Sequence, residues 1–201
     1  MPVSLLRLAD AIARILSLVA SAAAWLLLVM VAVIMFDVTA RKIPAFQGLI
    51  IDSWLVGYVS SIKLQEWEWH LHTIVFALCL GATYVADGHV RVDLWREKRS
   101  ERTQAWIEVI GILLLLIPYV GILLYYSIDF VATSYLQGEG STAVMGLGHR
   151  WLIKAVLAFG FLLLLLAALV VLLRKIASLA GLRPSPEAAS PDVPGTPLPP
   201  T

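Results

Sequence analysis

Four histidines are the side chains of this sequence that could hold a metal ion or a haem. Two histidines from different helices at one depth can ligate the iron of a b-type haem, and His72 and His149 form the pair to test. His70 and His72 are two residues apart, so on a helix they point to different faces. Histidines near a membrane interface are usually half-solvated hydrogen-bonding groups. We therefore expect no cofactor and no metal site, and keep a haem-binding membrane anchor of a respiratory complex as the alternative interpretation.

Acidic side chains and tryptophans alternate from Glu66 to Trp69. Residues 66 and 69 share one face of a helix, whereas 67 and 68 point elsewhere. Glu66 and Trp69 are therefore predicted to face protein, and Trp67 to lie among the interfacial aromatic residues. Glu139 and Ser141 occupy a loop expected at the same membrane face. Together these residues could form a docking edge for a soluble partner or a larger membrane subunit; the alternative is that they only anchor the helix at the lipid headgroups.

A polar segment with alternating valines follows, from His89 to Asp93. One of its sides can face the bilayer or protein while the other forms hydrogen bonds, so His89 and Asp93 are predicted to anchor a cytoplasmic loop. A solvated charge cluster is the alternative. The sequence contains no cysteine–histidine zinc spacing, serine-nucleophile motif or phosphate-binding glycine loop, so we expect no catalytic residue and no enzyme. The partner interface predicted from the sequence comprises Glu66, Trp69, His89, Asp93, Glu139 and Ser141.

Long apolar runs must position these residues. The chain has 201 residues, of which 60% are hydrophobic and only 14% are charged, and one soluble core cannot hide so many apolar side chains. An apolar helix of about 20 residues crosses the ~30 Å of hydrocarbon in a bilayer. The sequence therefore predicts an all-α membrane protein with four transmembrane helices. These are expected at about residues 15–36, 66–86, 106–128 and 151–173, in one membrane domain covering residues 1–178.

The distribution of Lys and Arg predicts the orientation, because cytoplasmic segments carry an excess of these residues. The N-terminal segment, the loop between the second and third runs, and the C-terminal end carry most of them. Both termini are therefore expected in the cytoplasm. The net charge of +1 and the lack of a basic arm argue against a nucleic acid partner.

Two further segments are expected outside the spans. Residues 45–63 form an apolar stretch interrupted by Asp52 and closed by Lys63. They are predicted to lie as an interfacial helix in the first outer loop, or to extend the second transmembrane helix. Residues 179–201 contain most of the ten prolines and few apolar side chains, so they are predicted to form a disordered cytoplasmic tail.

The predicted spans contain few polar groups at depth, which is where a transport site is usually found. Small residues do recur four apart, at Ala77 and Gly81 and at Ser17 and Ser21, and such spacing lets helices approach closely in lipid. Pro118 could bend the third helix. These features favour an accessory or scaffold subunit over a protein that moves a charged solute alone.

The order of these features resembles the small membrane subunit (Q-type component) of tripartite ATP-independent periplasmic (TRAP) transporters. The resemblance covers roughly residues 10–176. It is carried by the arginine after the first run (Arg41), the acidic-aromatic motif at 64–71, Gly81-Ala82, the HVRVD segment at 89–93, the segment Gly138–Ser141, and the lead into the last run, Arg150–Lys154.

The resemblance implies a multi-pass protein of the bacterial inner membrane, surrounded by membrane lipid. It implies two protein partners: a large TRAP membrane subunit that carries the substrate with sodium, and a periplasmic substrate-binding protein that captures an organic acid. The chain would act as the small permease subunit that supports the large one. Substrate contacts are then expected in the partners.

Overall fold

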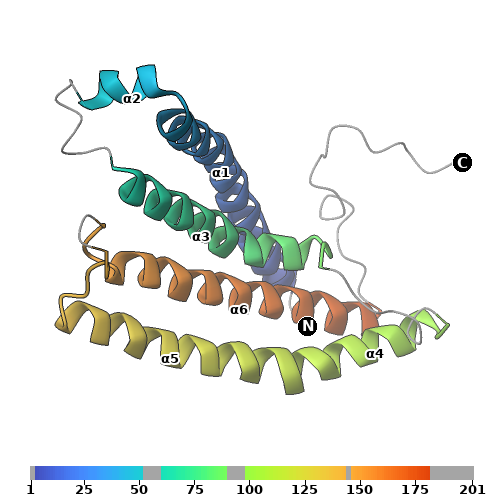
Figure 1. Ribbon diagram of the computed structural model, residues 1–201. Helices are drawn as coiled ribbons and strands as arrows, with labels where there is room; N and C mark the ends of the chain where they lie inside the picture. Colours follow the sequence, from blue (N-terminus) through green and yellow to red (C-terminus); the bar gives the residue numbers. More distant parts are fainter. Residues whose placement is uncertain (1–2, 52–59, 90–97, 144–145, 182–201) are drawn as a thin grey trace, which may run out of the picture.

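A computed structural model describes residues 3–51, 60–89, 98–143 and 146–181, all helices, turns and loops (Figure 1). The predicted all-α class is confirmed, since the described residues contain no strand. In chain order the helices are α1 (Val3–Lys42), α2 (Pro44–Ile51), α3 (Ser61–Val85), α4 (Glu101–Gly111), the π-helical turn η2 (Ile112–Leu116), α5 (Ile117–Leu136) and α6 (Trp151–Leu179).

Helix α6 is the centre of the bundle, because it contacts α1, α3, α4 and α5. Figure 1 shows α6 between α3 on one side and the α4–α5 helix on the other, with α1 inclined across α3. At one end of α6, Arg174 Nη2 lies 2.8 Å from Asp10 Oδ1 of α1, and Lys175 Nζ lies 2.7 Å from Glu108 Oε2 of α4. We call this the Arg174 end. The opposite end, where α6 begins, is the Arg150 end.

Three helices, rather than the four predicted, are long and apolar enough to cross a membrane: α1, the continuous helix from Glu101 to Leu136, and α6. The predicted second span, residues 66–86, lies in helix α3 but does not reach this degree of hydrophobicity. Its first turns carry Glu66, Glu68, His70 and His72. The apolar part that remains, residues 73–85, is shorter than the roughly 20 residues of a transmembrane helix.

The other helices extend beyond their predicted bounds. Helix α1 covers the predicted residues 15–36 and continues at both ends, and the third run is helical from Glu101 to Leu136 rather than over 106–128. Helix α6 begins at the predicted Trp151. Apolar periodicity marks the segment that can lie in lipid, whereas a helix ends only where its capping groups stop it. The hydroxyl of Ser100 accepts the backbone N–H of Thr103 and so caps the start of α4.

Residues 45–63, predicted to lie at the interface or to extend the second helix, contribute to two separate helices. Residues 44–51 form the separate helix α2, whereas residues 61–63 belong to α3, which is capped by Ser60. Residues 52–59 lie outside the described residues. Of the predicted tail, α6 includes residue 179, and residues 182–201 also lie outside the described residues.

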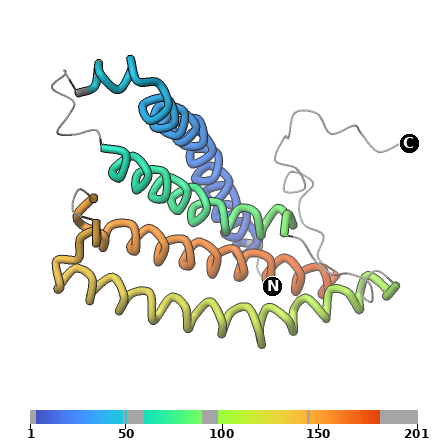
Figure 2. Tube along the Cα trace, in the orientation of Figure 1, coloured from blue at the N-terminus to red at the C-terminus, as the bar shows by residue number. Residues whose placement is uncertain are grey.

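The π-helical turn has an identifiable cause in Pro118. Proline has no backbone N–H, and its ring conflicts with the carbonyl four residues earlier, so an α-helix is disturbed there. The backbone N–H of Ile117 instead reaches the carbonyl of Ile112, five residues back. Figure 2 shows the trace of the α4–α5 helix changing direction in this region, as a bend caused by Pro118 would produce.

Small residues hold α3 and α6 together. Ala77 is fully buried, and a methyl group added at Gly160 would lie 2.7 Å from its Cβ. A methyl group at Gly81 would lie 2.7 Å from the carbonyl oxygen of Leu163. The predicted close contact at Ala77 and Gly81 is therefore present, and α6 is its partner. On α1, by contrast, Ser21 is exposed.

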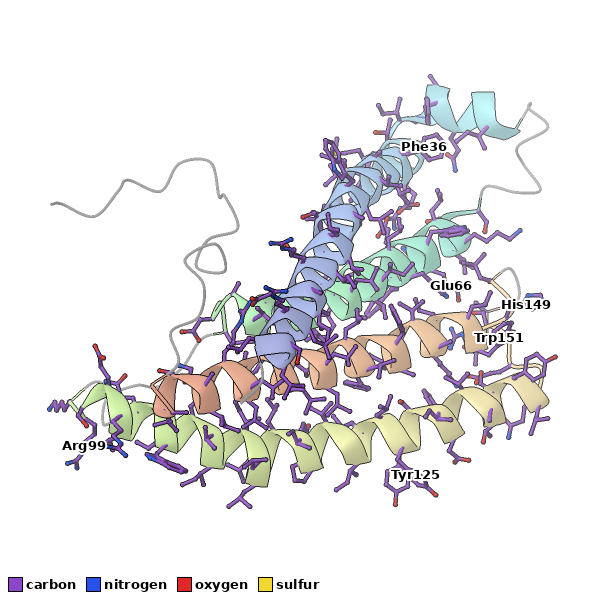
Figure 3. The ribbon with its side chains drawn as sticks, turned by 180° about the vertical axis from the view of Figure 1, so that it is seen from behind. Phe36, Glu66, Arg99, Tyr125, His149 and Trp151 are labelled. Carbon is purple, nitrogen blue, oxygen red and sulfur yellow. The ribbon has the colours of Figure 1, made fainter. Side chains whose placement is uncertain are left out.

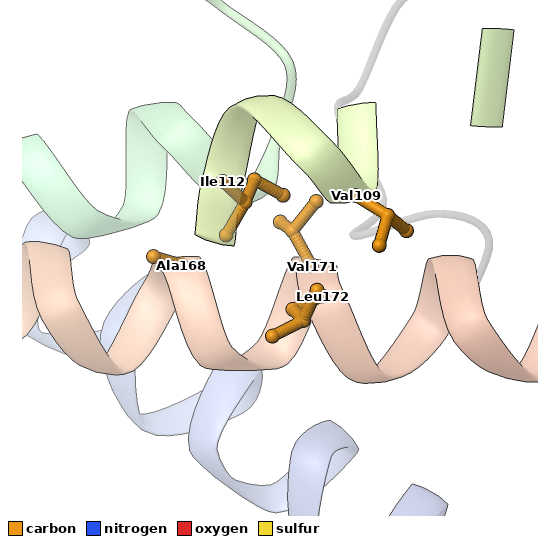
Figure 4. Packing of buried hydrophobic residues seen from close by; sticks show 5 residues of the cluster. All are labelled: Val109, Ile112, Ala168, Val171 and Leu172. Atoms are coloured by element: carbon orange, nitrogen blue, oxygen red, sulfur yellow. The ribbon is translucent and has the colours of Figure 1, made fainter. Parts of the chain in front are cut away.

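Two apolar clusters use different faces of α6. One contains Leu16 of α1 with Leu163 and Ala167 of α6. The other joins the α4 region to α6 near the Arg174 end (Figure 4); it comprises Val109, Ile112, Ala168, Val171 and Leu172. Helix α6 thus connects the elements on its two sides.

The α3–α6 contact predicts a difference between two glycine substitutions. Gly160→Ala places a methyl group against Ala77, which should cost about 1–3 kcal/mol through overpacking. Gly121→Ala is the matched control, because a methyl group there meets nothing within 4 Å, and alanine favours helix by about 1 kcal/mol. Thermal unfolding in detergent should rank Gly121→Ala at or above the wild type and Gly160→Ala below it. Equal midpoints for both variants would contradict the close approach.

Candidate functional site

The side chain of Glu66 joins three parts of the Arg150 end. Its Oε1 accepts a hydrogen bond from the hydroxyl of Ser141, and its Oε2 accepts the backbone N–H of Leu147. Arg150 Nη2 lies 3.5 Å from Oε1. Only 16% of the Glu66 side chain is exposed. Figure 3 shows Glu66 on α3, directed toward the loop that leads to His149 and Trp151. We call the contacts of Glu66 with Ser141, Leu147 and Arg150 the Glu66 clamp.

The loop held by this clamp, residues 137–150, is also closed by its own backbone. The N–H of Ser141 donates to the carbonyl of Leu147 at 2.9 Å, and the N–H of Arg150 donates to the carbonyl of Glu139 at 3.0 Å. A methyl group at Gly146 would lie 2.2 Å from Ser141 Oγ and 2.8 Å from Glu66 Oε1. Only glycine therefore leaves room for the carboxylate to reach the loop.

A second ion pair fixes the same loop to α6. Lys154 Nζ contacts Glu139 Oε2 and lies 3.6 Å from the centre of the Phe130 ring. The Lys154 side chain is 14% exposed, so the carboxylate and the ring take the place of most of its water. The hydrogen bond from Lys154 holds the pKa of Glu139 below its ordinary value. Loop, α5 and α6 are thereby joined at one point.

The clamp also changes the acidity of Glu66. Hydrogen bonds from Ser141 and then from Leu147 stabilise the charged form, and Arg150 adds a smaller attraction, so the pKa of Glu66 is below its ordinary value of 4.5. Hydrogen bonds to an ionised carboxylate are stronger than neutral ones. Glu66 is therefore a charged structural group at neutral pH.

A pocket of about 340 Å³ opens between α3 and α6 beside the clamp. The carboxylate of its lining residue Glu66 already has a basic partner in Arg150, and His70 Nδ1 lies 2.5 Å from the backbone carbonyl of Glu66. Within the described part of the chain, no three His, Cys, Asp or Glu side chains gather as metal ligands would. The lining residues are Glu66, Trp69, His70, Thr73, Arg150, Ile153 and Lys154.

The structure brings some of the predicted interface residues together and separates others. Glu66 and Ser141 are in contact, and Glu139 belongs to the same loop. Trp69 is well exposed, with 76% of its surface accessible. His89 is exposed and contacts the ring of Tyr84, beyond the opposite end of α3. Asp93 lies outside the described residues, and a role in partner binding stays a prediction for the whole set.

The two histidines of the haem alternative are both exposed. His72 lies on the outer surface of α3, and His149 has a left-handed backbone with φ of 58° in the loop before α6. Among the described residues, neither takes part in a group of metal-binding side chains. The haem alternative therefore gains no support.

Sequence reasoning did not single out Asp37. Its carboxylate is fully buried, pairs with Arg41 one turn later, and accepts a hydrogen bond of 3.0 Å from the Ser61 hydroxyl. This contact joins the end of α1 to the start of α3. An aspartate four residues before an arginine at a helix end is a signal that could have revealed the ion pair. The bond to Ser61 has no comparable local signal.

Comparison with known proteins identifies one family. Residues 30–178 match the family model described as "Tripartite ATP-independent periplasmic transporters, DctQ component". The matched range contains the Glu66 clamp, all of α3, α4 and α5, and α6 up to residue 178. No curated protein and no solved structure matches the chain.

The clamp predicts a pH-dependent difference between two conservative substitutions. Glu66→Gln removes a charge that three groups stabilise, so it should lower the free energy of unfolding by about 1–3 kcal/mol at neutral pH. Glu68→Gln, two residues away, is the control and should leave stability nearly unchanged. Thermal unfolding in detergent measures both.

The difference should depend on pH in one direction. The pKa of Glu66 is lower in the folded than in the unfolded chain, so its stabilisation is complete above the ordinary value of 4.5 and is lost as pH falls below it. The midpoints of wild type and Glu66→Gln should therefore converge on acidification. A constant gap from neutral to acidic pH would show that the charge of Glu66 does not contribute.

Proposed function

The chain belongs to the family of DctQ components of tripartite ATP-independent periplasmic transporters, and on this basis we propose that it is the small permease subunit of a sodium-coupled transporter for an organic acid. Members of this family work with a large membrane subunit and a periplasmic binding protein. The small subunit supports the large one in the bacterial inner membrane, and the large subunit carries the substrate with sodium.

The location of the charged groups favours a scaffold role over ion transport. Among the described residues, α6 and the loop before it form four ion pairs, and these four lie at the two ends of the bundle. Between the ends, the buried side chains of α6 are apolar or small. An ion at membrane depth needs oxygen ligands to replace its water. Pairs at the ends instead fix the relative position of helices, which is the property required of a scaffold.

The Glu66 clamp is the observation that favours a docking edge at the Arg150 end. It holds the 137–150 loop against α3, beside the exposed side chains of Trp67 and Trp69. A surface whose shape is fixed before binding loses less entropy when a partner docks. Trp69 and the loop residues Glu139 and Ser141 form this proposed edge, with Glu66 holding the loop in place. His89 and Asp93 are proposed to anchor the cytoplasmic loop at the other end.

The proposed orientation places the Arg150 end in the periplasm. The first turns of α1, the start of α4 and the end of α6 all belong to the Arg174 end of the bundle (Figure 1), and their basic residues favour the cytoplasmic side. The tryptophans at residues 67, 69 and 151 suit the opposite interface.

Reconstitution tests the supporting role. Proteoliposomes that contain the complete transporter should accumulate the organic acid when a sodium gradient and the binding protein are present. The small subunit alone should show no uptake above empty liposomes, because its ion pairs fix structure rather than coordinate a moving ion. Sodium-dependent uptake by the isolated chain would refute the proposed role.

Cysteine labelling tests the orientation. In a Cys79→Ser background, a cysteine at Gly140 should react with an impermeant maleimide added to spheroplasts, because the 137–150 loop faces the periplasm. A cysteine at Ser100, at the start of α4, should react only after the membrane is permeabilised. The reverse pattern would invert the proposed topology.

A further inference from the structure

One face of α5 carries polar and aromatic side chains where a lipid-facing helix would carry aliphatic ones. It consists of residues separated by three or four positions, which lie in line on a helix. Tyr125 is 71% exposed and Tyr126 is 65% exposed, and their rings meet edge to face at 5.4 Å. Figure 3 shows Tyr125 pointing away from the other helices. We call this surface the tyrosine–aspartate face; it comprises Ile122, Tyr125, Tyr126, Asp129 and Thr133.

Helix α5 packs on α6 through a different side. Its buried residues are Val120, Ser127 and Ser134. The tyrosine–aspartate face therefore points out of the bundle, and within the described residues nothing covers it. Helix α1 also exposes much of its surface, but that surface is mainly aliphatic, as at Leu18 and Leu28, and suits acyl chains.

Asp129 is the residue that requires a partner. It is exposed, and among the described residues it has no hydrogen bond and no ion pair. It lies within the membrane-crossing helix from Glu101 to Leu136, six residues before Tyr135. Tyr135 and Trp151 form an edge-to-face pair at the Arg150 end, which suits the membrane interface. At 1.5 Å per residue, Asp129 lies about 9 Å further into the membrane.

The direction in which the Asp129 side chain points makes a partner for its carboxylate more necessary. The Cα–Cβ bond of a helical residue tilts toward the helix N-terminus. Since α5 runs toward the Arg150 end, the short Asp129 side chain tilts away from the nearby interface. Lys154 shows the opposite case: α6 begins at that end, so its long side chain tilts outward and reaches Glu139. A carboxylate facing lipid at this depth is unfavourable without a cation beside it.

We propose that the tyrosine–aspartate face of α5 binds a helix of the large membrane subunit, and that this helix places an Arg or Lys side chain beside Asp129. The proposal rests on the proposed function and adds to it the contact surface and the chemistry of the contact. The two tyrosines provide rigid aromatic contact area, which is enriched in protein interfaces. The small side chain of Thr133 allows the partner helix to come close.

Photo-crosslinking locates the contact in the assembled complex. Benzoylphenylalanine is introduced at Tyr126, and the small and large subunits are expressed together and irradiated in membranes. The matched control is the same substitution at Ile128, which is 59% exposed at nearly the same depth but lies about 160° around the helix from position 126. A crosslinked product with the mass of both subunits is expected at position 126 and not at position 128.

Charge substitution tests the chemistry. Asp129→Lys should reduce recovery of the large subunit with the tagged small subunit by about tenfold or more, because it replaces attraction with repulsion in a desolvated contact. Asp129→Glu keeps the charge and should retain most of the recovery. The thermal midpoint of the isolated small subunit should be the same for both variants and the wild type, since no described residue pairs with Asp129.

Each other outcome overturns the proposal. Crosslinks from position 126 to phospholipid alone would assign the face to lipid. Normal recovery of the large subunit with Asp129→Lys would show that the proposed ionic contact does not exist. A lowered thermal midpoint of the isolated Asp129→Lys subunit would show that Asp129 contributes to folding. If the wild-type subunits copurify while position 126 gives no protein crosslink, the tyrosine–aspartate face is not the contact surface, but the proposed function stands. If wild-type subunits do not copurify, the proposed function itself fails.

Discussion

The close contact between α3 and α6 is the constraint on which the rest of the structure depends. In lipid, helices associate mainly by packing, so the distance between two backbones decides how strongly they hold. Gly160 and Gly81 leave no room for a methyl group at this contact. The resulting register places the first turns of α3 beside the start of α6, where Glu66 reaches both Arg150 and the 137–150 loop. A shift of one helix turn, about 5 Å, would break these hydrogen bonds.

The charged groups are arranged around that apolar contact rather than within it. Ion pairs join the elements at the Arg174 end and at the Arg150 end, where water and headgroups reduce the cost of a charge. Such pairs contribute little attraction when exposed but fix which ends of the helices lie together. Helix α3 reflects the same division: its acidic and histidine-rich first turns belong to the Arg150 end, and its small and apolar residues pack on α6. The composition of α3 is therefore too polar for a helix that faces lipid along its whole length. Its contacts are instead made with α1 and α6.

The proposed scaffold role requires surfaces for partners as well as internal rigidity. The exposed side of α1 is largely aliphatic, the α5 surface carries Tyr125, Tyr126 and Asp129, and the Arg150 end carries exposed tryptophans beside a fixed loop. These three surfaces differ in chemistry, so they suit different neighbours: acyl chains, a membrane-embedded protein helix and a soluble protein.

The sequence by itself determined the features that depend on composition and local spacing. Apolar runs predicted an all-α membrane protein and the start of α6. Ala77 and Gly81 predicted a close helix contact, and the family motifs predicted the family. Tertiary structure alone decided which polar groups meet. Glu66 joins Ser141 and Arg150 across 75 and 84 residues, and Asp37 joins Ser61, because the order and register of the helices bring them together. Periodicity shows which side of a helix is apolar, but it carries no information about which element packs on that side. Hydropathy averaged over α3 likewise could not separate the polar first turns of this helix from the residues that pack on α6.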